Sequence, residues 1–383
     1  MRILIAVDSF KGSLGSAEAG AAIAAGLRAG LAEIGIQADI EIVPTADGGE
    51  GTLEAFAAAC GGERISLAAP GPLGDPILSA FHLLPGRTTA IIESAQTCGL
   101  TLVAGREDIL HSTTAGLGLQ VRKAMDLRPE RIFIGLGGSA TNDWGAGMAD
   151  ELGVRFLDGG GRRLHPHPQA LAGIRKADIG GLDSRVRSVR FTALADVDNP
   201  LLGPRGAATV FAPQKGADPE TVKRLEESGR RFADAVESAV GLSLRDRPGA
   251  GAAGGLGFAA MAFLGADLRP GIEALIETAG LSAKARGVDL IVTGEGRLDV
   301  QSRSGKTVMG ISRLARESGV PCVAFCGSIT GPSSDYVPAL FAAAYVIRPE
   351  AASLEEAMAR AGAFLETIAR RAARDFPLLA SRP

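Results

Sequence analysis

Five segments of the sequence combine glycine with carboxylate, hydroxyl or ammonium side chains, and each follows a predicted strand. In an open α/β sheet the carboxyl ends of the strands line the ligand crevice, so chemistry is expected at these positions. One such turn alone is typical of a helix N-cap, but five of them with carboxylates indicate a polar small-molecule site. The segments are D-S-F-K-G-S-L (8–14), P-T-A-D-G-G-E-G-T (44–52), G-L-G-G-S-A-T-N-D (135–143), A-D-V-D-N-P-L-L-G (195–203) and T-G-E-G-R-L-D (293–299), which continues to S-G-K-T (304–307).

Lysine usage points to anion binding in these loops. Only seven of the 40 basic residues are lysine, yet Lys11, Lys215 and Lys306 each adjoin a glycine in a polar loop. A lysine ammonium acts on phosphate as a compact point charge, a role in which the planar arginine side chain is a poor replacement. Chance placement in a chain with 52 glycines remains the alternative.

The sequence does not fully match either of two familiar nucleotide-binding motifs. The P-loop pattern G-x-x-x-x-G-K-[ST] requires a glycine at position 300, which is Val300. Residues 135–140 followed by Asp158 imitate a dinucleotide fingerprint, but the run 141–143 favours an N-cap and starts the helix later than that fingerprint requires. An NAD-linked hydroxy-acid dehydrogenase therefore remains only as a minor alternative.

Composition excludes several classes of protein. The hydrophobic fraction of 46% and the charged fraction of 22% are typical of a globular chain. A formal charge of −3 without blocks of like charge argues against nucleic-acid or lipid-surface binding. The first apolar run is too short for a signal peptide, which predicts a cytoplasmic protein. The uncharged stretch 249–266 consists largely of glycine and alanine, and predicts a buried turn and helix rather than a membrane span.

The order of predicted elements indicates an α/β fold with two domains. Strand, polar turn and helix follow one another at both chain ends, which is the pattern of a doubly wound sheet. The prolines near residue 72 mark a change, after which two runs around Pro85 and Gly86 predict paired antiparallel strands. We therefore expect a Rossmann-like domain from residues 1–72 and 286–383, with an inserted mixed α/β domain over residues 73–285. The segment 293–305 is predicted to be a loop.

Together the motifs resemble those of the bacterial glycerate kinase family, of the glycerate 2-kinase type. The resemblance runs essentially end to end and in the order of that family. Trp144 departs from its pattern, because glycine is usual there. The motifs lie at residues 8–14, 44–52, 134–148, 196–203, 214–217, 248–257 and 293–306.

This resemblance implies ATP-dependent phosphorylation of D-glycerate with Mg²⁺, usually at the 2-hydroxyl, in a two-domain α/β fold distinct from the P-loop kinases. Its partners are then small molecules. Phosphorylation at the 3-hydroxyl remains open because the two hydroxyls differ only by pose. A non-catalytic ligand-binding module is a further alternative, distinguished by binding without turnover.

Phosphoryl transfer needs a carboxylate near the attacking hydroxyl, oxygen ligands for Mg²⁺ and N–H-rich loops with cations for the phosphates. Asp196 is the candidate general base because it follows the apolar run F-T-A-L-A at a strand end, and Lys11 and Asp47 are further catalytic candidates. The candidate metal ligands are Asp47 and Glu50. The candidate substrate contacts are Asp8, Ser9, Lys11 and Arg297. The candidate nucleotide contacts are Gly137, Gly138, Ser139, Thr141, Asn142, Glu295 and Lys306.

Overall fold

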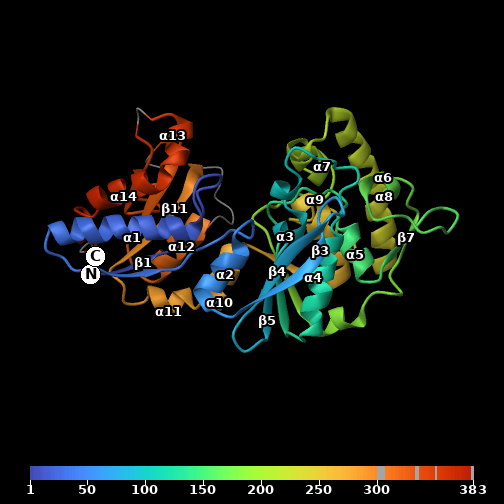
Figure 1. Ribbon diagram of the computed structural model, residues 1–383, viewed down its shortest axis with the longest axis horizontal. Coiled ribbons are helices and arrows are strands. Elements are labelled where there is room, and N and C mark those ends of the chain that lie inside the picture. Colours follow the sequence, from blue (N-terminus) through green and yellow to red (C-terminus); the bar gives the residue numbers. More distant parts are fainter. Residues whose placement is uncertain (300–306, 333–335, 350–351, 381–383) are drawn as a thin grey trace. The chain divides into compact units, whose positions relative to one another are not determined.

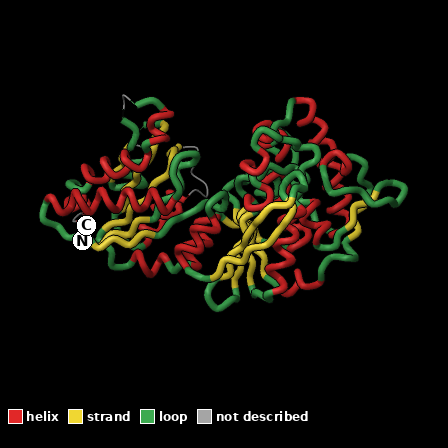
Figure 2. Tube along the Cα trace, viewed as in Figure 1, coloured by secondary structure: helices red, strands yellow, loops and turns green. Residues whose placement is uncertain are grey.

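The chain folds into two compact α/β units, shown as ribbons in Figure 1 and as a tube in Figure 2. The structure is a computed structural model and describes residues 1–299, 307–332, 336–349 and 352–380. Unit 1 consists of Met1–Asp47, Glu54–Cys60 and Pro270–Pro383, and unit 2 consists of Gly48–Leu53 and Gly61–Arg269. The predicted α/β class is confirmed.

The described part of unit 1 contains a five-stranded parallel sheet in the order β13-β12-β11-β1-β2. Numbered along the chain within this unit, the order reads 2-1-3-4-5, one of the two common doubly wound arrangements. The winding reverses between β1 and β11, and ligands bind at such a switch point in open α/β sheets. The strands are β1 (Arg2–Ile5), β2 (Asp39–Ile42), β11 (Leu290–Asp299), β12 (Cys322–Thr330) and β13 (Ala343–Val346).

Helices cover both faces of this sheet. On one face α1 (Ser16–Glu33) lies along α14 (Ala361–Ala372), and both pack on the apolar side chains of β1 and β11. Gly26 and Gly30 permit this close approach, because a Cβ at either position would lie 2.2 Å from a carbonyl oxygen of α14. The remaining helices are α10 (Gly271–Thr278), α11 (Leu281–Ala285), α12 (Thr307–Glu317), which packs on β11 and β12, α13 (Leu354–Ala359) and α15 (Phe376–Ala380).

Unit 2, whose residues are all described, contains a six-stranded mixed sheet in the order β10-β9-β6-β5-β4-β3. The first four strands in this order are parallel, and β5-β4-β3 form an antiparallel meander. This confirms the antiparallel pairing that was predicted around Pro85 and Gly86. The strands are β3 (Glu63–Pro70), β4 (Pro76–Leu83), β5 (Thr89–Glu93), β6 (Arg131–Gly135), β9 (Arg190–Leu194) and β10 (Asp267–Arg269), with a separate pair of β7 (Arg155–Leu157) and β8 (Lys176–Asp178).

The uncharged stretch 249–266 folds as a turn and the buried helix α9 (Ala252–Leu264), as predicted. No helix among the described residues is long and apolar enough to cross a membrane. Most of α2 (Thr52–Cys60) belongs to unit 1. The other helices of unit 2 are α3 (Ala95–Cys98), η1 (Leu100–Val103), α4 (Ala115–Asp126), α5 (Ala146–Glu151), α6 (Pro168–Leu171), η2 (Ser184–Ser188), α7 (Ala207–Phe211), η3 (Pro213–Lys215) and α8 (Pro219–Val240).

Two features differ from the sequence-based expectations. The units divide near residues 61 and 270 rather than 73 and 286, because β3 pairs with β4 in the unit 2 sheet while α10 and α11 pack on α12 of unit 1. The start of the predicted loop 293–305 is also wrong, since β11 continues to Asp299 and pairs with β12 along its length. The glycines and charged residues of this segment are typical of a loop, and the strand pairing depends on β12, which lies elsewhere in the chain.

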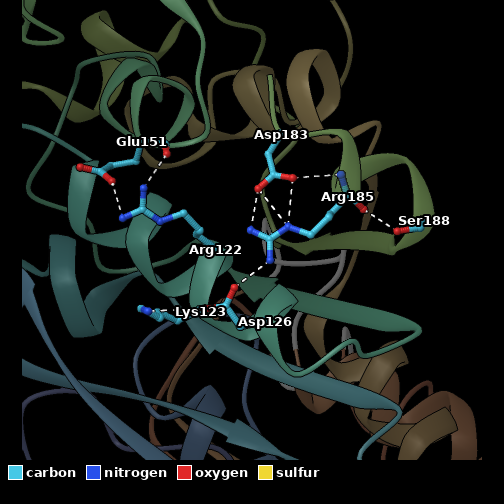
Figure 3. Close-up of polar contacts among 7 residues, drawn as sticks. All are labelled: Arg122, Lys123, Asp126, Glu151, Asp183, Arg185 and Ser188. Carbon is cyan, nitrogen blue, oxygen red and sulfur yellow. Dashed lines mark hydrogen bonds and ion pairs between the residues drawn. The ribbon is translucent and has the colours of Figure 1, made fainter. Parts of the chain in front are cut away.

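A surface network of ion pairs joins α4 to its neighbours in unit 2 (Figure 3). Arg185 of η2 contacts Asp183 at 2.6 Å and Asp126 of α4 at 2.7 Å. Arg122 of α4 contacts Glu151 of α5 at 3.3 Å. Such exposed pairs contribute about 1 kcal/mol or less each, and none of these residues belongs to the predicted site.

Trp144 occupies a backbone position that favours glycine. Its φ of 56° lies in the left-handed region, where glycine is favoured because it has no Cβ. The indole is nevertheless 1% exposed and stacks on Phe232 of α8 with ring centroids 5.6 Å apart. Burial of this large side chain therefore offsets the backbone strain.

Trp144→Gly tests which of these two effects is larger. Relief of left-handed strain stabilises by about 1 kcal/mol, whereas loss of a buried aromatic side chain costs about 3 to 5 kcal/mol. We expect the free energy of unfolding to fall by about 2 to 4 kcal/mol in urea denaturation. The control is Arg87→Gly, which removes an exposed left-handed residue with φ 57° and should not destabilise. Unchanged stability of Trp144→Gly would contradict the account.

Candidate functional site

Asp8 lies at the switch point of the unit 1 sheet, three residues after the end of β1. Its carboxylate accepts hydrogen bonds from the Ser9 N–H at 2.6 Å and from the Thr307 hydroxyl at 2.7 Å. Ser9 follows β1 in the chain, and Thr307 begins α12, the helix that follows β11 and packs on it. The segments that follow the two strands flanking the switch point therefore supply the two hydrogen-bond donors. Burial and then the charge of Asp47 raise the pKa of Asp8 to about 6, against the opposing effect of these hydrogen bonds and of Lys11. A buried carboxylate that titrates near neutrality is typical of a functional site.

Lys11 and Asp47 form an ion pair beside Asp8. The Lys11 Nζ lies 3.0 Å from the Asp47 carboxylate, and the lysine side chain is 77% exposed against 13% for the aspartate. The loop that carries Lys11 lies against β11 at Gly296, where a Cβ would lie 3.5 Å from the backbone nitrogen of Lys11. The structure thus brings together three of the predicted residues of unit 1, with the cation facing solvent.

The other predicted residues of unit 1 are more dispersed. Ser9 is half-buried next to Asp8, and its contact with the Asp8 carboxylate is made by its backbone N–H. Glu295 and Arg297 lie within β11 rather than in a loop, and alternate residues of a strand share one face. Arg297 is 67% exposed and lies 3.7 Å from Asp299. Lys306 lies outside the described residues.

In unit 2 the loop after β6 begins with two glycines that face a glycine turn. The Gly137 N–H donates to the Gly48 carbonyl at 3.0 Å, and a Cβ on Gly137 would lie 2.4 Å from the Gly49 Cα. Gly138 is exposed with φ 78°, and the exposed Glu50 adjoins it, since a Cβ on Gly138 would be 3.9 Å from the Glu50 Cβ. Among the described residues, no acceptor is found for the N–H groups of Gly138 and Ser139. Successive N–H groups that lack an acceptor, next to a left-handed glycine, are typical of an anion-binding concavity.

The loop continues into a sealed polar interior. Lys215 is 2% exposed, and its Nζ donates to the Ser139 Oγ at 2.9 Å and to the Thr141 carbonyl at 2.7 Å. Burial lowers the pKa of Lys215 to about 7, although the Asp143 carboxylate and Cys98 act in the opposite direction. A buried ammonium is costly, so its retention here calls for a role.

Asp143 anchors the far end of the same loop. Its carboxylate accepts hydrogen bonds from the N–H groups of Thr114, Gly145 and Gly147 and from the Thr114 hydroxyl, at 2.8 to 3.0 Å. Burial raises its pKa, while these four donors oppose that shift. α5 begins at Ala146, which confirms the late helix start predicted from the run 141–143.

Thr141 and Asn142 lie inside this sealed region rather than at its surface. Both are 0% exposed, and the Thr141 Oγ1 and both polar side-chain atoms of Asn142 have no partner among the described residues. A phosphate could reach these side chains only if the loop opened. The exposed backbone of the predicted nucleotide loop is therefore at Gly137 and Gly138, with the Ser139 side chain 5% exposed directly behind them.

Asp196 follows β9, the strand next to β6, and is half-buried. The Leu194 carbonyl that ends β9 accepts from the Leu136 N–H at 3.0 Å, so the two strand ends lie together. Asp198 differs sharply, because it is 72% exposed and pairs with Arg205 at 2.7 Å. Asp196 therefore lies half-buried near the carboxyl end of β9, whereas Asp198 lies on the surface.

The sequence analysis gave no role to Thr307 or Asp143, and it named Lys215 only as one of three lysines that could bind an anion. The partners of Thr307, Lys215 and Asp143 lie 299, 76 and 29 residues away in the chain, which local patterns cannot indicate. No group of three or more potential metal ligands is found in the described ranges. A cavity of about 680 Å³ adjoins α8 and includes none of the predicted residues.

Asp8→Asn should stabilise the protein, and increasingly so as the pH rises. The folded state raises the pKa of Asp8 from 3.8 to about 6, so the wild type loses stability between these pH values and stays lower above them. Asparagine cannot ionise. Urea denaturation without metal or ligand should show the advantage of the variant growing by roughly 2 kcal/mol from pH 4.5 to 7.5. The exposed Asp39→Asn serves as the control, and an advantage that shrinks with pH would refute the assignment.

Comparison with known proteins gives the family of this chain. Residues 3–377 match the model of the glycerate kinase family. The glycerate kinase of Bacillus subtilis (strain 168) is 42% identical over 97% of this chain and 96% of its own length, and the glycerate 2-kinase of Escherichia coli (strain K12) is 40% identical over 86% of each chain. A crystal structure from Salmonella typhimurium LT2, described as glycerate kinase 2, superposes with a TM-score of 0.84 at 37% identity over 99% of this chain and 98% of that one. The resemblance that the motifs carry is confirmed, and the chain belongs to the glycerate kinase family.

Proposed function

We propose that this protein transfers a phosphoryl group from ATP to the 2-hydroxyl of D-glycerate, giving 2-phosphoglycerate and ADP in the cytoplasm. The observation that carries the proposal is the 40% identity, over 86% of each chain, to a relative named glycerate 2-kinase. The sites in the two units support it, because one offers carboxylates with an exposed cation and the other offers unspent N–H donors. Phosphoryl transfer relies on such positioning and charge neutralisation more than on covalent chemistry.

In this proposal the edge of the unit 1 sheet binds glycerate. Lys11 holds the glycerate carboxylate, since its ammonium is exposed and Asp47 fixes its position at 3.0 Å. Asp8 and Ser9 contact the substrate hydroxyls from the loop after β1. Arg297 is the second candidate for the carboxylate, which a guanidinium can bind through two parallel hydrogen bonds.

The nucleotide phosphates bind the loop of unit 2 at Gly137, Gly138 and Ser139. The support is the pair of N–H groups without an acceptor in the described structure and the left-handed Gly138 that exposes them. Thr141 and Asn142 support this loop from inside. Glu295 and Lys306 remain predicted nucleotide contacts.

Asp47 and Glu50 are the proposed ligands for Mg²⁺, with Asp47 also counted among the catalytic residues through its hold on Lys11. Their carboxylate oxygens suit a hard cation, and Mg²⁺ is usually held by one or two carboxylates together with substrate phosphates and water. Each of the two carboxylates is by its chemistry a suitable ligand for such an ion. The ion would neutralise charge on the transferred group.

Asp196 is the proposed general base, and Asp196→Asn tests it. Asparagine keeps the size and most hydrogen bonding but cannot accept the hydroxyl proton, so kcat should fall by about 10² to 10⁴. ATP affinity should stay near the wild-type value, and the thermal midpoint should stay within a few degrees. The measurement is steady-state kinetics with calorimetric ATP binding.

Asp198→Asn is the matched control, because this exposed aspartate pairs with Arg205 on the surface. A larger loss of kcat in Asp198→Asn than in Asp196→Asn would leave the motif in place but reverse the assignment within it. If neither variant lowers kcat, the base lies elsewhere, and Asp8 and Asp47 are the next candidates.

Product identification tests the reaction itself. After incubation with D-glycerate and Mg-ATP, phosphorus NMR should show a phosphate ester coupled to the single proton at carbon 2. Coupling to two protons would place the phosphate on the 3-hydroxyl and correct the regiochemistry. Absence of any new ester, with ATP intact, contradicts the proposed activity.

A further inference from the structure

We propose that Lys215 is a positioning residue that directs the Ser139 hydroxyl proton toward a phosphate oxygen of the bound nucleotide. The inference rests on the proposed function, because it names a partner for a nucleotide at the loop 137–139. It assigns a task to Lys215, whose side chain is buried against that loop.

The direction of the hydrogen bond carries the argument. In its protonated form the Lys215 side chain can only donate, whereas a serine hydroxyl has one donor and two acceptor positions. The Lys215 Nζ lies 2.9 Å from the Ser139 Oγ, so the Oγ accepts there. The second bond, 2.7 Å to the Thr141 carbonyl, holds the ammonium in place. The single proton of Ser139 is therefore left for another acceptor.

That proton has no acceptor within the described residues. The N–H groups of Gly138 and Ser139 are unspent as well, and Gly138 is exposed. Three donors without an acceptor among the described residues thus lie on two adjacent residues, of which Gly138 is exposed and Ser139 is buried behind it. An anion with several acceptor oxygens satisfies all three, which is the chemistry of a phosphate group.

The Asp143 carboxylate acts on Lys215 through its charge but makes its hydrogen bonds elsewhere. Asp143 already accepts four hydrogen bonds from Thr114, Gly145 and Gly147, so it does not depend on the ammonium for partners. A neutral donor could hold the Thr141 carbonyl without burying an ion. Behind Ser139, however, a positive charge strengthens the hydroxyl as a donor to an anion, because hydrogen bonds in a chain polarise one another.

A double-mutant cycle on the full-length enzyme tests the inference. Ser139→Ala and Lys215→Met should each raise KM for ATP by about 10- to 100-fold, the effect of a charge-assisted hydrogen bond, with KM for D-glycerate unchanged within twofold. In the Ser139→Ala background, Lys215→Met should raise KM for ATP by less than threefold, since the lysine acts through the serine. Lys223→Met, an exposed lysine of α8, is the control and should leave both values unchanged.

Multiplying effects of the two substitutions would overturn the inference while leaving the kinase assignment intact. Failure of the wild type to use ATP would instead remove the proposed function. If Lys215→Met does not fold, Ser139→Ala decides alone, with direct ATP titration and a thermal melt. An unchanged affinity for ATP in that variant contradicts the role of the hydroxyl.

Discussion

The geometry of parallel strands is the constraint on which both candidate sites depend. Parallel strands deliver their carboxyl ends to one edge of the sheet, and the segments that follow must turn there. In unit 1 this edge brings Asp8, after β1, against Thr307 at the start of α12. In unit 2 it brings the Gly137 loop after β6 beside the end of β9, two residues before Asp196. Glycines then allow the turns to approach one another, as at Gly137, where a Cβ would lie 2.4 Å from the Gly49 Cα.

Several groups at these edges are held in states that oppose stability. Burial raises the pKa of Asp8 and Asp143 and lowers that of Lys215, so each ionised form is costly where it lies. Four hydrogen-bond donors compensate the buried charge of Asp143, and two acceptors compensate that of Lys215. The pKa of Asp8 stays raised, at about 6. The apolar cores of the two units offset these costs. Trp144 shows the same balance in the backbone, where burial of an indole outweighs a left-handed φ.

Sequence patterns predicted the elements whose signals are local. The runs that became β1 and β6, the antiparallel hairpin around Pro85 and the late start of α5 follow from periodicity and turn chemistry. The extension of β11 through Gly294 to Asp299 did not, because its partner β12 lies elsewhere in the chain and supplies the missing hydrogen bonds. The unit boundaries were misplaced for the same reason.

The candidate site divides in the same way. Glycine, lysine and aspartate in short loops made Asp8, Lys11, Asp47 and the Gly137 loop candidates from residue type alone. Burial was not predictable from the loop sequence, so Thr141 and Asn142 were expected to contact phosphate although both side chains are sealed. Contacts such as Lys215 with Ser139 join segments 76 residues apart and emerge only from the fold.

The central claim is that glycerate binds the edge of unit 1 while ATP binds the glycine loop of unit 2. Amide hydrogen exchange followed by mass spectrometry, with each ligand added separately, tests it most directly. The account predicts that D-glycerate slows exchange in peptides covering residues 8–12, and that Mg-ATP slows exchange in peptides covering residues 137–140. Protection of residues 8–12 by ATP alone, without protection at 137–140, would contradict it.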